Sequence, residues 1–246
     1  MKRSMLPVAG ALAAVSLALA ACGQGADMPR EGADEVGSAE AAGSVADIVA
    51  ANPEAVRIAL ENDYVRVLRF DLEPEASLPP HEGGRRVIYA VTDYEIEWTE
   101  AGMEATQRSW KRGDVHPHEA GIHSVRNGGT TTASFVVFER LEAPLPAAED
   151  QAETASLPTG TRSLLEEPGI EVLEVELQPG DAQEMHPGGW RSIYALTDYT
   201  IEWREGDEVS ERMWSAGDAH WHEPGPHAAS NVGDTAARWI VVTFER

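Results

Sequence analysis

The chain has 246 residues, 42% of them hydrophobic, which is enough to build one large folded domain or two small ones. Its formal net charge of −23 at pH 7 argues against binding to nucleic acid and against an electrostatic hold on anionic lipid, because both are themselves negatively charged. Cys22 is the only cysteine, which excludes an intrachain disulfide, a thiolate metal cluster and a cysteine nucleophile in the folded part.

The first residues have the layout of a secretory signal. Met1-Lys2-Arg3 is a basic start, and the apolar run from Leu6 to Ala21 is too short to span a membrane. Leu19-Ala20-Ala21-Cys22 is similar to the lipobox of bacterial lipoproteins, which implies cleavage of a signal peptide (1–21) and lipid attachment at Cys22. In the lipoproteins that this segment resembles, an aspartate after the lipid-bearing cysteine would suggest retention in the inner membrane. Gly23 stands at that position, so the resemblance favours the outer membrane. We therefore expect a periplasmic protein of the bacterial cell envelope, held to the membrane only by its lipid; an ordinary cleaved signal with a stray cysteine is the alternative.

Residues 22–51 are rich in Ala, Gly, Glu and Asp without a sustained apolar period, which predicts a flexible acidic tether. From Asn62 the sequence changes to short apolar runs typical of strands. Val87–Val91 and Tyr94–Trp98 are predicted to pair as a hairpin around Thr92-Asp93. Because the runs are short and no convincing helix separates them, the sequence predicts a β-barrel or sandwich.

Residues 141–161 contain three prolines and are predicted to be a linker. After the linker the first pattern returns, which indicates a duplicated β domain covering residues 55–140 and 162–246. The segments that recur are Tyr89–Tyr94 as Tyr194–Tyr199, Ile96–Trp98 as Ile201–Trp203, and Phe138-Glu139-Arg140 as Phe244-Glu245-Arg246.

Each repeat also carries the pattern G-D-x-H-x-H-E-x-G-x-H-x-x-x-N, beginning at Gly113 and at Gly217. In a strand, residues two apart point to the same side, so the first two histidines of the pattern are expected to share a face, and the third returns from the next strand. Neutral imidazoles suit transition metals, which predicts a divalent metal in one or both repeats. The alternative is that the first two histidines line an outer strand face. All eight histidines of the chain fall at matched positions: His81/His186, His116/His220, His118/His222 and His123/His227.

These motifs resemble the cupin superfamily in its two-domain, or bicupin, form, over roughly residues 62–140 and 163–246. The resemblance implies an all-β fold of two tandem cupin-type barrels (double-stranded β-helix or jelly roll), and it makes His123 and His227 metal ligands. In the first cupin motif only His81 and His186 match. Arg86 and Arg191 stand where the family has a glutamate, so the usual three-His, one-Glu set is not matched.

Several charged residues near the histidines are candidate site residues. Glu119 and Glu223 follow the paired histidines and could complete a metal shell or act as a catalytic base, or could be solvated loop carboxylates. Glu184 lies two residues before His186, which on a strand predicts a shared face and an extra carboxylate ligand in the second repeat. Arg86 and Arg191 could clamp a carboxylate substrate or pair with acidic side chains.

Two functional hypotheses follow. The chain lacks a phosphate-binding Gly-rich loop ending in Lys and lacks G-x-S-x-G, so nothing indicates nucleotide or acyl-transfer chemistry. The first hypothesis is a metal-dependent enzyme of the dioxygenase or isomerase type, using Fe, Mn, Zn, Ni or Cu on a small oxygenated substrate. The second is a non-catalytic envelope lipoprotein that binds a small anion or the metal itself.

Overall fold

The computed structural model describes residues 47–147 and 156–244. The predicted signal peptide, Cys22 and most of the predicted tether lie outside the described residues. Within the described part the chain is almost entirely β, with eighteen strands and one helix of four residues, α1 (Ile48–Ala51), in which the carboxylate of Asp47 accepts hydrogen bonds from the first backbone amides. No helix in these ranges is both long and apolar enough to span a membrane.

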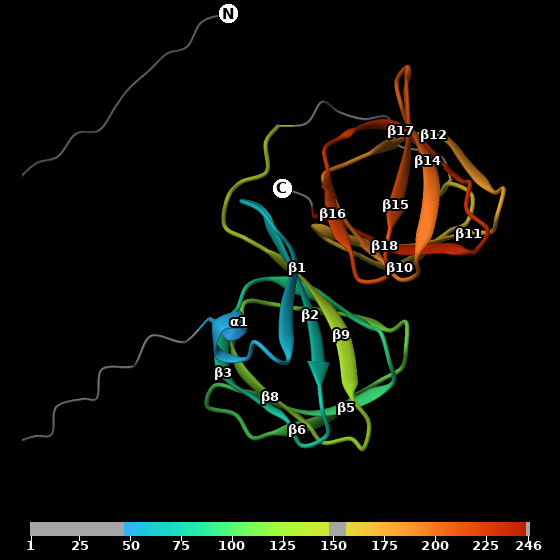
Figure 1. Cartoon of the computed structure of the whole chain (residues 1–246). Coiled ribbons are helices and arrows are strands. Elements are labelled where there is room, and N and C mark those ends of the chain that lie inside the picture. The colour runs from blue at the N-terminus through green and yellow to red at the C-terminus, as the bar shows by residue number, and fades with distance from the viewer. Residues whose placement is uncertain (1–46, 148–155, 245–246) are drawn as a thin grey trace, which may run out of the picture. The chain divides into compact units, whose positions relative to one another are not determined.

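The strands divide into two sets of nine that follow the two sequence repeats (Figure 1). We call the first set barrel one and the second set barrel two. Barrel one contains β1 (Val56–Glu61), β2 (Val65–Leu72), β3 (Ser77–Gly83), β4 (Arg86–Ala90), β5 (Tyr94–Glu100), β6 (Thr106–Trp110), β7 (Val115–His118), β8 (Gly121–Asn127) and β9 (Ala133–Arg140). Barrel two contains β10 (Thr161–Glu167), β11 (Ile170–Leu177), β12 (Ala182–Gly188), β13 (Arg191–Ala195), β14 (Tyr199–Glu205), β15 (Glu208–Trp214), β16 (Ala219–His222), β17 (Gly225–Asn231) and β18 (Ala237–Phe244).

Each barrel is made of two antiparallel sheets with the same topology. In barrel one the orders are β1-β2-β9-β4-β7 and β3-β8-β5-β6, and in barrel two they are β10-β11-β18-β13-β16 and β12-β17-β14-β15. Consecutive strands repeatedly belong to different sheets, which is the jelly-roll arrangement and encloses one interior per repeat. The predicted fold class, two tandem all-β barrels, is therefore confirmed.

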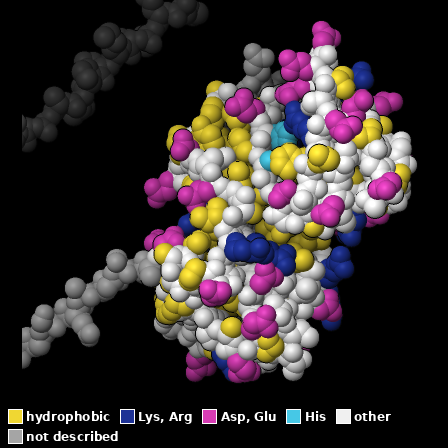
Figure 2. All heavy atoms as spheres, in the orientation of Figure 1, with side chains coloured by type: hydrophobic (Ala, Val, Ile, Leu, Met, Phe, Trp, Pro, Cys, Tyr) yellow, Lys and Arg dark blue, Asp and Glu magenta, His cyan; other side chains and the backbone are white. Residues whose placement is uncertain are grey.

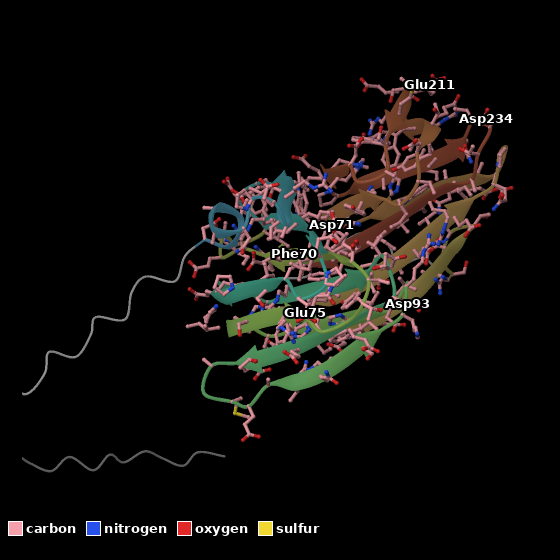
Figure 3. All side chains as sticks on the ribbon, turned by 60° about the horizontal axis from the view of Figure 1, so that its bottom comes forward. Phe70, Asp71, Glu75, Asp93, Glu211 and Asp234 are labelled. Atoms are coloured by element: carbon pink, nitrogen blue, oxygen red, sulfur yellow. The ribbon has the colours of Figure 1, made fainter. Side chains whose placement is uncertain are left out.

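Side chains alternate between the interior and the exterior of each barrel. On β2, Phe70 stacks against Phe135 inside barrel one at 4.8 Å, whereas the neighbouring Asp71 faces the other way and accepts hydrogen bonds from Arg69 and Ser134 (Figure 3). Strands β4 and β13 are buried on both faces, because their outward side chains join an apolar cluster shared by the two repeats. Acidic side chains are spread over the visible face in Figure 2 rather than gathered in one patch.

The predicted hairpin between Val87–Val91 and Tyr94–Trp98 is wrong. Strands β4 and β5 are consecutive but lie in different sheets, with β4 between β9 and β7 and β5 between β8 and β6. The segment between β4 and β5 is hydrogen-bonded to other parts of the barrel. The backbone amides of Val91 and Thr92 donate to the backbone oxygen of Ser134, and the carboxylate of Asp93 accepts from the backbone amide of Arg112. Thr92-Asp93 therefore lies where the chain passes from the sheet of β4 to the sheet of β5, and not in a hairpin turn.

The pairing register also corrects the sequence match between the two repeat ends. Val67 pairs with Phe138 in barrel one, and its counterpart Val172 pairs with Val242 in barrel two. Phe138 therefore corresponds to Val242 rather than Phe244, and Glu139 corresponds to Thr243. A shift of two residues keeps every side chain on the same face of a strand, so the apolar pattern alone could not detect it.

The Gly-Asp pairs that open the histidine motif have a local structural role. Gly113 and Gly217 have positive φ angles of 92° and 98°, which favour glycine. The carboxylates of Asp114 and Asp218 then accept hydrogen bonds from the backbone amides three residues earlier, at 2.7 and 2.8 Å. These two residues close the turn that delivers β7 and β16, and with them the paired histidines, to the site.

Candidate functional site

Each barrel gathers one arginine and four histidines from strands of both sheets. In barrel one, His81 on β3 is the cross-strand partner of His123 on β8, and their ring centroids lie 4.2 Å apart. Arg86 on β4 is the cross-strand partner of His118 on β7. Barrel two repeats this arrangement, with His186 and His227 also 4.2 Å apart and Arg191 opposite His222. The sequence motifs therefore do converge in space.

The first two histidines of the motif lie on one strand face, and in barrel one they bond to each other, whereas in barrel two His220 Nδ1 is buried without a hydrogen-bond partner among the described residues. His116 Nδ1 is 2.8 Å from His118 Nε2, and Tyr94 lies with its hydroxyl 3.2 Å from His116 Nε2. Both ring nitrogens of His116 are therefore engaged within the protein. Its ring also stacks on Trp110 at 4.2 Å, and in barrel two His220 stacks on Trp214 at 3.8 Å.

A buried indole forms the wall beside the other two histidines. The ring of Trp98 stacks against His123 at 4.2 Å and against His118 at 4.6 Å. Trp203 stacks against His227 with ring centroids 4.5 Å apart and is tilted against His222, with ring centroids 4.7 Å apart. These histidines are thus fixed as members of an aromatic wall, which restricts the directions in which their nitrogens can point.

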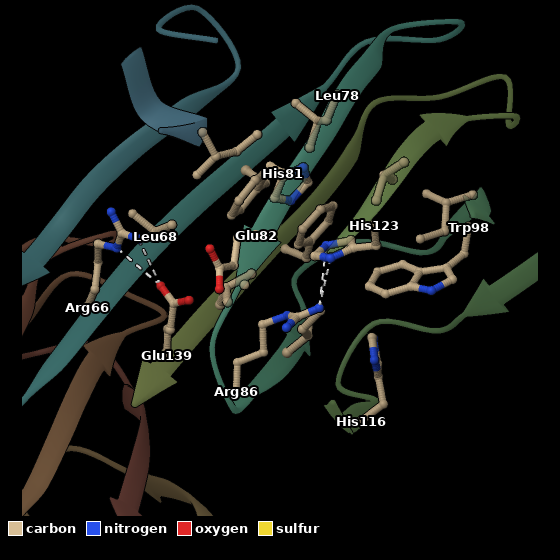
Figure 4. Close-up of a pocket in the computed structure, with 18 of the residues that line it drawn as sticks. Arg66, Leu68, Leu78, His81, Glu82, Arg86, Trp98, His116, His123 and Glu139 are labelled. Atoms are coloured by element: carbon tan, nitrogen blue, oxygen red, sulfur yellow. Dashed lines mark hydrogen bonds and ion pairs between the residues drawn. The ribbon is translucent and has the colours of Figure 1, made fainter. Parts of the chain in front are cut away.

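The centre of each site is a buried guanidinium. Arg86 is only 4% exposed; its Nη1 donates to the backbone oxygens of Gly84 and Glu119 at 2.8 and 3.2 Å, and its Nη2 lies 3.3 Å from His123 Nδ1 (Figure 4). Arg191, 5% exposed, makes the equivalent contacts in barrel two, with its Nη2 3.2 Å from His227 Nδ1. Nη1 of Arg191 donates to Gly189 and Glu223 oxygens at 2.8 and 3.3 Å.

Neither guanidinium forms an ion pair with a carboxylate of the described residues, although the chain is rich in acids. Burial lowers the pKa of Arg191 to about 10 and also lowers that of Arg86, so both remain cationic at neutral pH. A buried cation without a counter-ion is costly, which makes these two arginines the most unusual electrostatic feature of the structure.

All eight histidines are held in the neutral form. Burial is the main cause, because it disfavours the charged imidazolium, and the adjacent guanidinium adds to the effect at His123 and His227. Burial lowers the pKa of four histidines, His116, His123, His220 and His227, to about 3. It lowers the pKa of His118 to about 4 and that of His222 to about 2. The pKa values of His81 and His186 are lowered as well.

The predicted divalent metal does not fit these side chains as they lie. Among residues 47–147 and 156–244, no three or more His, Cys, Asp or Glu side chains are arranged so that they could hold a metal ion. Two physical reasons are visible. The guanidinium of Arg86 or Arg191 occupies the space next to the ring nitrogens of His123 or His227, and a second positive charge there would repel the metal. In barrel one, His116 and His118 also use their facing nitrogens to bond each other.

The acidic candidates do not reach the site with their carboxylates. Glu119 has a side chain 86% exposed, and its nearest cation is Arg85 at 3.8 Å; Glu223 is also exposed. What both residues contribute is a backbone carbonyl, which accepts from the buried arginine. The structure therefore gives no support to a catalytic base at either position.

Glu184 does not share a face with His186, contrary to the spacing argument. The register of β12 against β17 shifts between Gln183 and His186, which marks a bulge. As a result Gln183 and His186 line the interior of barrel two, whereas Glu184 is exposed and lies with Met185 on the outer surface. The residue that the sequence reasoning missed is thus Gln183, and the available signal was that it replaces the apolar Leu78 of the first repeat.

The two interiors differ in size. In barrel one the cavity measures about 40 Å³ and is lined mostly by apolar side chains around Arg86, with Ile48 of α1 among them. In barrel two the cavity measures about 190 Å³ and is lined by Arg191, Gln183, His186 and Trp203 among others.

Comparisons of sequence and of structure give different answers. No protein-family model matches the chain, and no curated protein sequence does so. Among solved structures, AerE from Microcystis aeruginosa is similar with a TM-score of 0.58 and 15% identity, covering 78% of this chain and 94% of AerE. The Mn(II)-containing oxalate decarboxylase of Bacillus subtilis has a TM-score of 0.56 and 13% identity over 77% of this chain and 72% of its own. Oxalate decarboxylase from Lactobacillus farciminis, in a formate complex, gives 0.56 and 15%, covering 78% and 84%. At these identities the likeness is one of fold.

Proposed function

We propose that this chain, which has the two-domain fold of the cupin superfamily, binds a small carboxylate anion at the buried guanidinium of its barrels. The observation that carries the proposal is the state of Arg86 and Arg191. Each is at least nine-tenths buried, each donates only to backbone carbonyls and a neutral imidazole, and neither has a carboxylate partner among the described residues.

The electrostatics favour an anion over any other occupant. Arg191 has five N–H donors, and its contacts with Gly189, Glu223 and His227 leave Nε–H and one hydrogen of Nη2 without a partner in the described part of the chain. Two donors on adjacent nitrogens are what a carboxylate accepts from arginine. The imidazoles around the guanidinium are neutral, so they carry no charge that would neutralise the guanidinium in place of a bound anion.

The metal-dependent enzyme expected from the sequence is the second candidate. His81 and His186 favour it, because each donates Nδ1–H to a backbone carbonyl, at 2.8 and 2.7 Å, and so keeps a lone pair on Nε2. The solved Mn(II) oxalate decarboxylase supports a divalent metal in this fold. In this chain the metal would have to displace a guanidinium, and for that reason we rank it second.

We also propose the attachment indicated by the sequence, in which Cys22 carries lipid and the protein lies in the periplasm at the outer membrane. The support is the basic start, the short apolar run and the lipobox-like Leu19–Cys22. In this setting a membrane-tethered anion-binding domain would meet small carboxylates that enter the envelope.

Calorimetric titration of protein purified without a histidine tag tests the proposal. Protein treated with a chelator should bind acetate, propionate or lactate but not the matching amides. The double variant Arg86→Gln/Arg191→Gln should lose this binding, whereas Arg57→Gln, which alters an exposed ion pair with Asp71, should keep it. If carboxylates bind only after metal is restored, the second candidate replaces the first. If none binds under either condition, both are wrong.

A further inference from the structure

We infer that barrel two is the ligand-binding barrel and that its ligand is a small hydroxycarboxylate, with the carboxylate on Arg191 and the hydroxyl on His186. This inference rests on the proposed function and deepens it. The comparison of the two repeats carries it, because each position of barrel two has a counterpart in barrel one under the same fold.

Three substitutions between the repeats change the interior of barrel two, in addition to Trp239, which stands at the position of Phe135 and adds volume. Val175 stands at the position of Phe70, Ala229 at that of Val125, and Gln183 at that of Leu78. The first two remove volume, and the third places a buried amide where barrel one is apolar. The cavities in the two interiors measure about 190 Å³ in barrel two and about 40 Å³ in barrel one, where Arg86 also lines a separate cavity of about 300 Å³ with His118 and His123. A cavity of roughly 150 Å³ accommodates a molecule of the size of benzene, so barrel two has room for a small organic acid.

The charges around the arginine also differ. In barrel one the buried carboxylate of Glu139 lies on β9 opposite Arg86 and pairs with Arg66 at 3.1 Å. Its negative charge already acts on Arg86 and would repel an incoming anion. In barrel two the residue opposite Arg191 is Thr243, which carries no charge.

Two acidic residues lie near the cavity of barrel two. Glu171 is part of its lining, and Glu205, an exposed residue at the end of β14, is an acid whose charge acts on Arg191. Burial lowers the pKa of both guanidinium groups; Glu139 and Glu100 oppose the lowering at Arg86, and Glu205 opposes it at Arg191. We therefore expect an external anion to be stabilised more strongly by Arg191 than by Arg86 in barrel one.

The donors and acceptors of the cavity define the rest of the ligand. His186 donates Nδ1–H to the backbone oxygen of Glu184 at 2.7 Å, which leaves its Nε2 as an acceptor. The His186 ring lies 4.2 Å from that of His227, which contacts Arg191. A carboxylate on the arginine thus places a neighbouring hydroxyl within reach of a hydrogen-bond acceptor. Trp203 and Trp239 supply apolar walls for a short hydrocarbon part.

Leu157, in the described part of the predicted linker, lines the cavity of barrel two and is 45% exposed. The helix that covers barrel one instead places Ile48, which is buried, against its cavity.

Lactate and propionate form the matched pair of probes, because they differ by one hydroxyl. Titration of the full-length, chelator-treated protein should show one site that binds one lactate enantiomer roughly 5- to 10-fold more tightly than propionate, the value of one neutral hydrogen bond. Arg191→Gln should weaken lactate binding at least about 10-fold, whereas Arg57→Gln, which alters an exposed ion pair with Asp71, should leave it within about 2-fold. His186→Phe should remove the preference for lactate and leave propionate binding.

Val175→Phe introduces the side chain of barrel one and should block binding without removing any polar group; thermal unfolding checks that this variant is folded. If Arg86→Gln abolishes binding and Arg191→Gln does not, the assignment to barrel two is wrong while the proposed function stands. If lactate and propionate bind equally in the native protein, the hydroxycarboxylate class is wrong. Absence of any carboxylate binding overturns the proposed function itself.

Discussion

Mild acid should destabilise this protein strongly, because its buried histidines are neutral when folded and free to take up a proton when unfolded. The pKa of His123 and of His227 is about 3 in the folded state against an ordinary value of 6.5. Between those two pH values the unfolded chain binds more protons than the native one, so stability is lost as the pH falls below about 6.5. Above that pH the effect is absent.

The size of the effect follows from the width of the pH window. Each pH unit below the unfolded pKa costs about 1.4 kcal/mol per histidine, so at pH 5 each of these two residues costs about 2 kcal/mol and the pair about 4 kcal/mol. His116, His118, His220 and His222 act in the same direction. A typical domain has about 5–15 kcal/mol of stability in total, so the loss is a large part of it.

Urea unfolding at pH 7 and at pH 5, followed by tryptophan fluorescence in the presence of a chelator, measures this directly. Ordinary carboxylates, with pKa values near 4, stay largely ionised over this range and contribute little. The double variant His123→Asn/His227→Asn should lose about 4 kcal/mol of the pH dependence. A native free energy of unfolding that changes by less than about 1 kcal/mol between the two pH values would refute the neutral, buried state of the imidazoles.

Three further predictions concern the scaffold and its attachment. Asn127→Ala should lower the free energy of unfolding by about 2–4 kcal/mol in chemical denaturation, because the buried amide donates to Leu72 and Thr131 oxygens at 2.8 and 2.9 Å; an effect below about 1 kcal/mol would contradict this role. Cys22→Ser should release the protein from the membrane fraction, and full retention would place the anchor elsewhere. Limited proteolysis should cut first within residues 141–161 or before residue 51, and early cleavage in Val87–Trp98 would contradict the predicted domain boundaries.

Much of the fold could be predicted because duplication shows the same strand pattern twice in one chain. The apolar runs around Val67, Ile88 and Phe135 all became strands. The sheet to which each strand belongs could not be predicted, because a corner between sheets and a hairpin turn use the same residue types. Thr92-Asp93 is such a corner, and its partners, Ser134 and Arg112, are distant in sequence.

The site was predictable in its composition and not in its chemistry. The sequence motifs identified the arginines and histidines that converge, since matched spacing in two repeats constrains which residues share a strand face. The bulge that turns Glu184 away from His186 depends on pairing with β17, which no local pattern contains. The contact between Arg86 and His123 likewise joins strands of opposite sheets, so the exchange of glutamate for arginine could be noted but its consequence could not be derived.

The buried guanidinium groups favour the proposed anion over a metal on electrostatic grounds. A metal bound to His123 would lie about 2 Å from a ring nitrogen, and the Nη2 of Arg86 already lies 3.3 Å from the same ring. A divalent ion roughly 4–5 Å from a guanidinium is repelled by about 7 kcal/mol at an effective dielectric constant of 20. In the cupin ligand set that the sequence resembles, a glutamate would offset part of the metal charge, whereas Arg86 and Arg191 add a positive charge to the site. Because each barrel already contains a buried guanidinium, a bound anion would be attracted to the site where a metal ion would be repelled, as we propose.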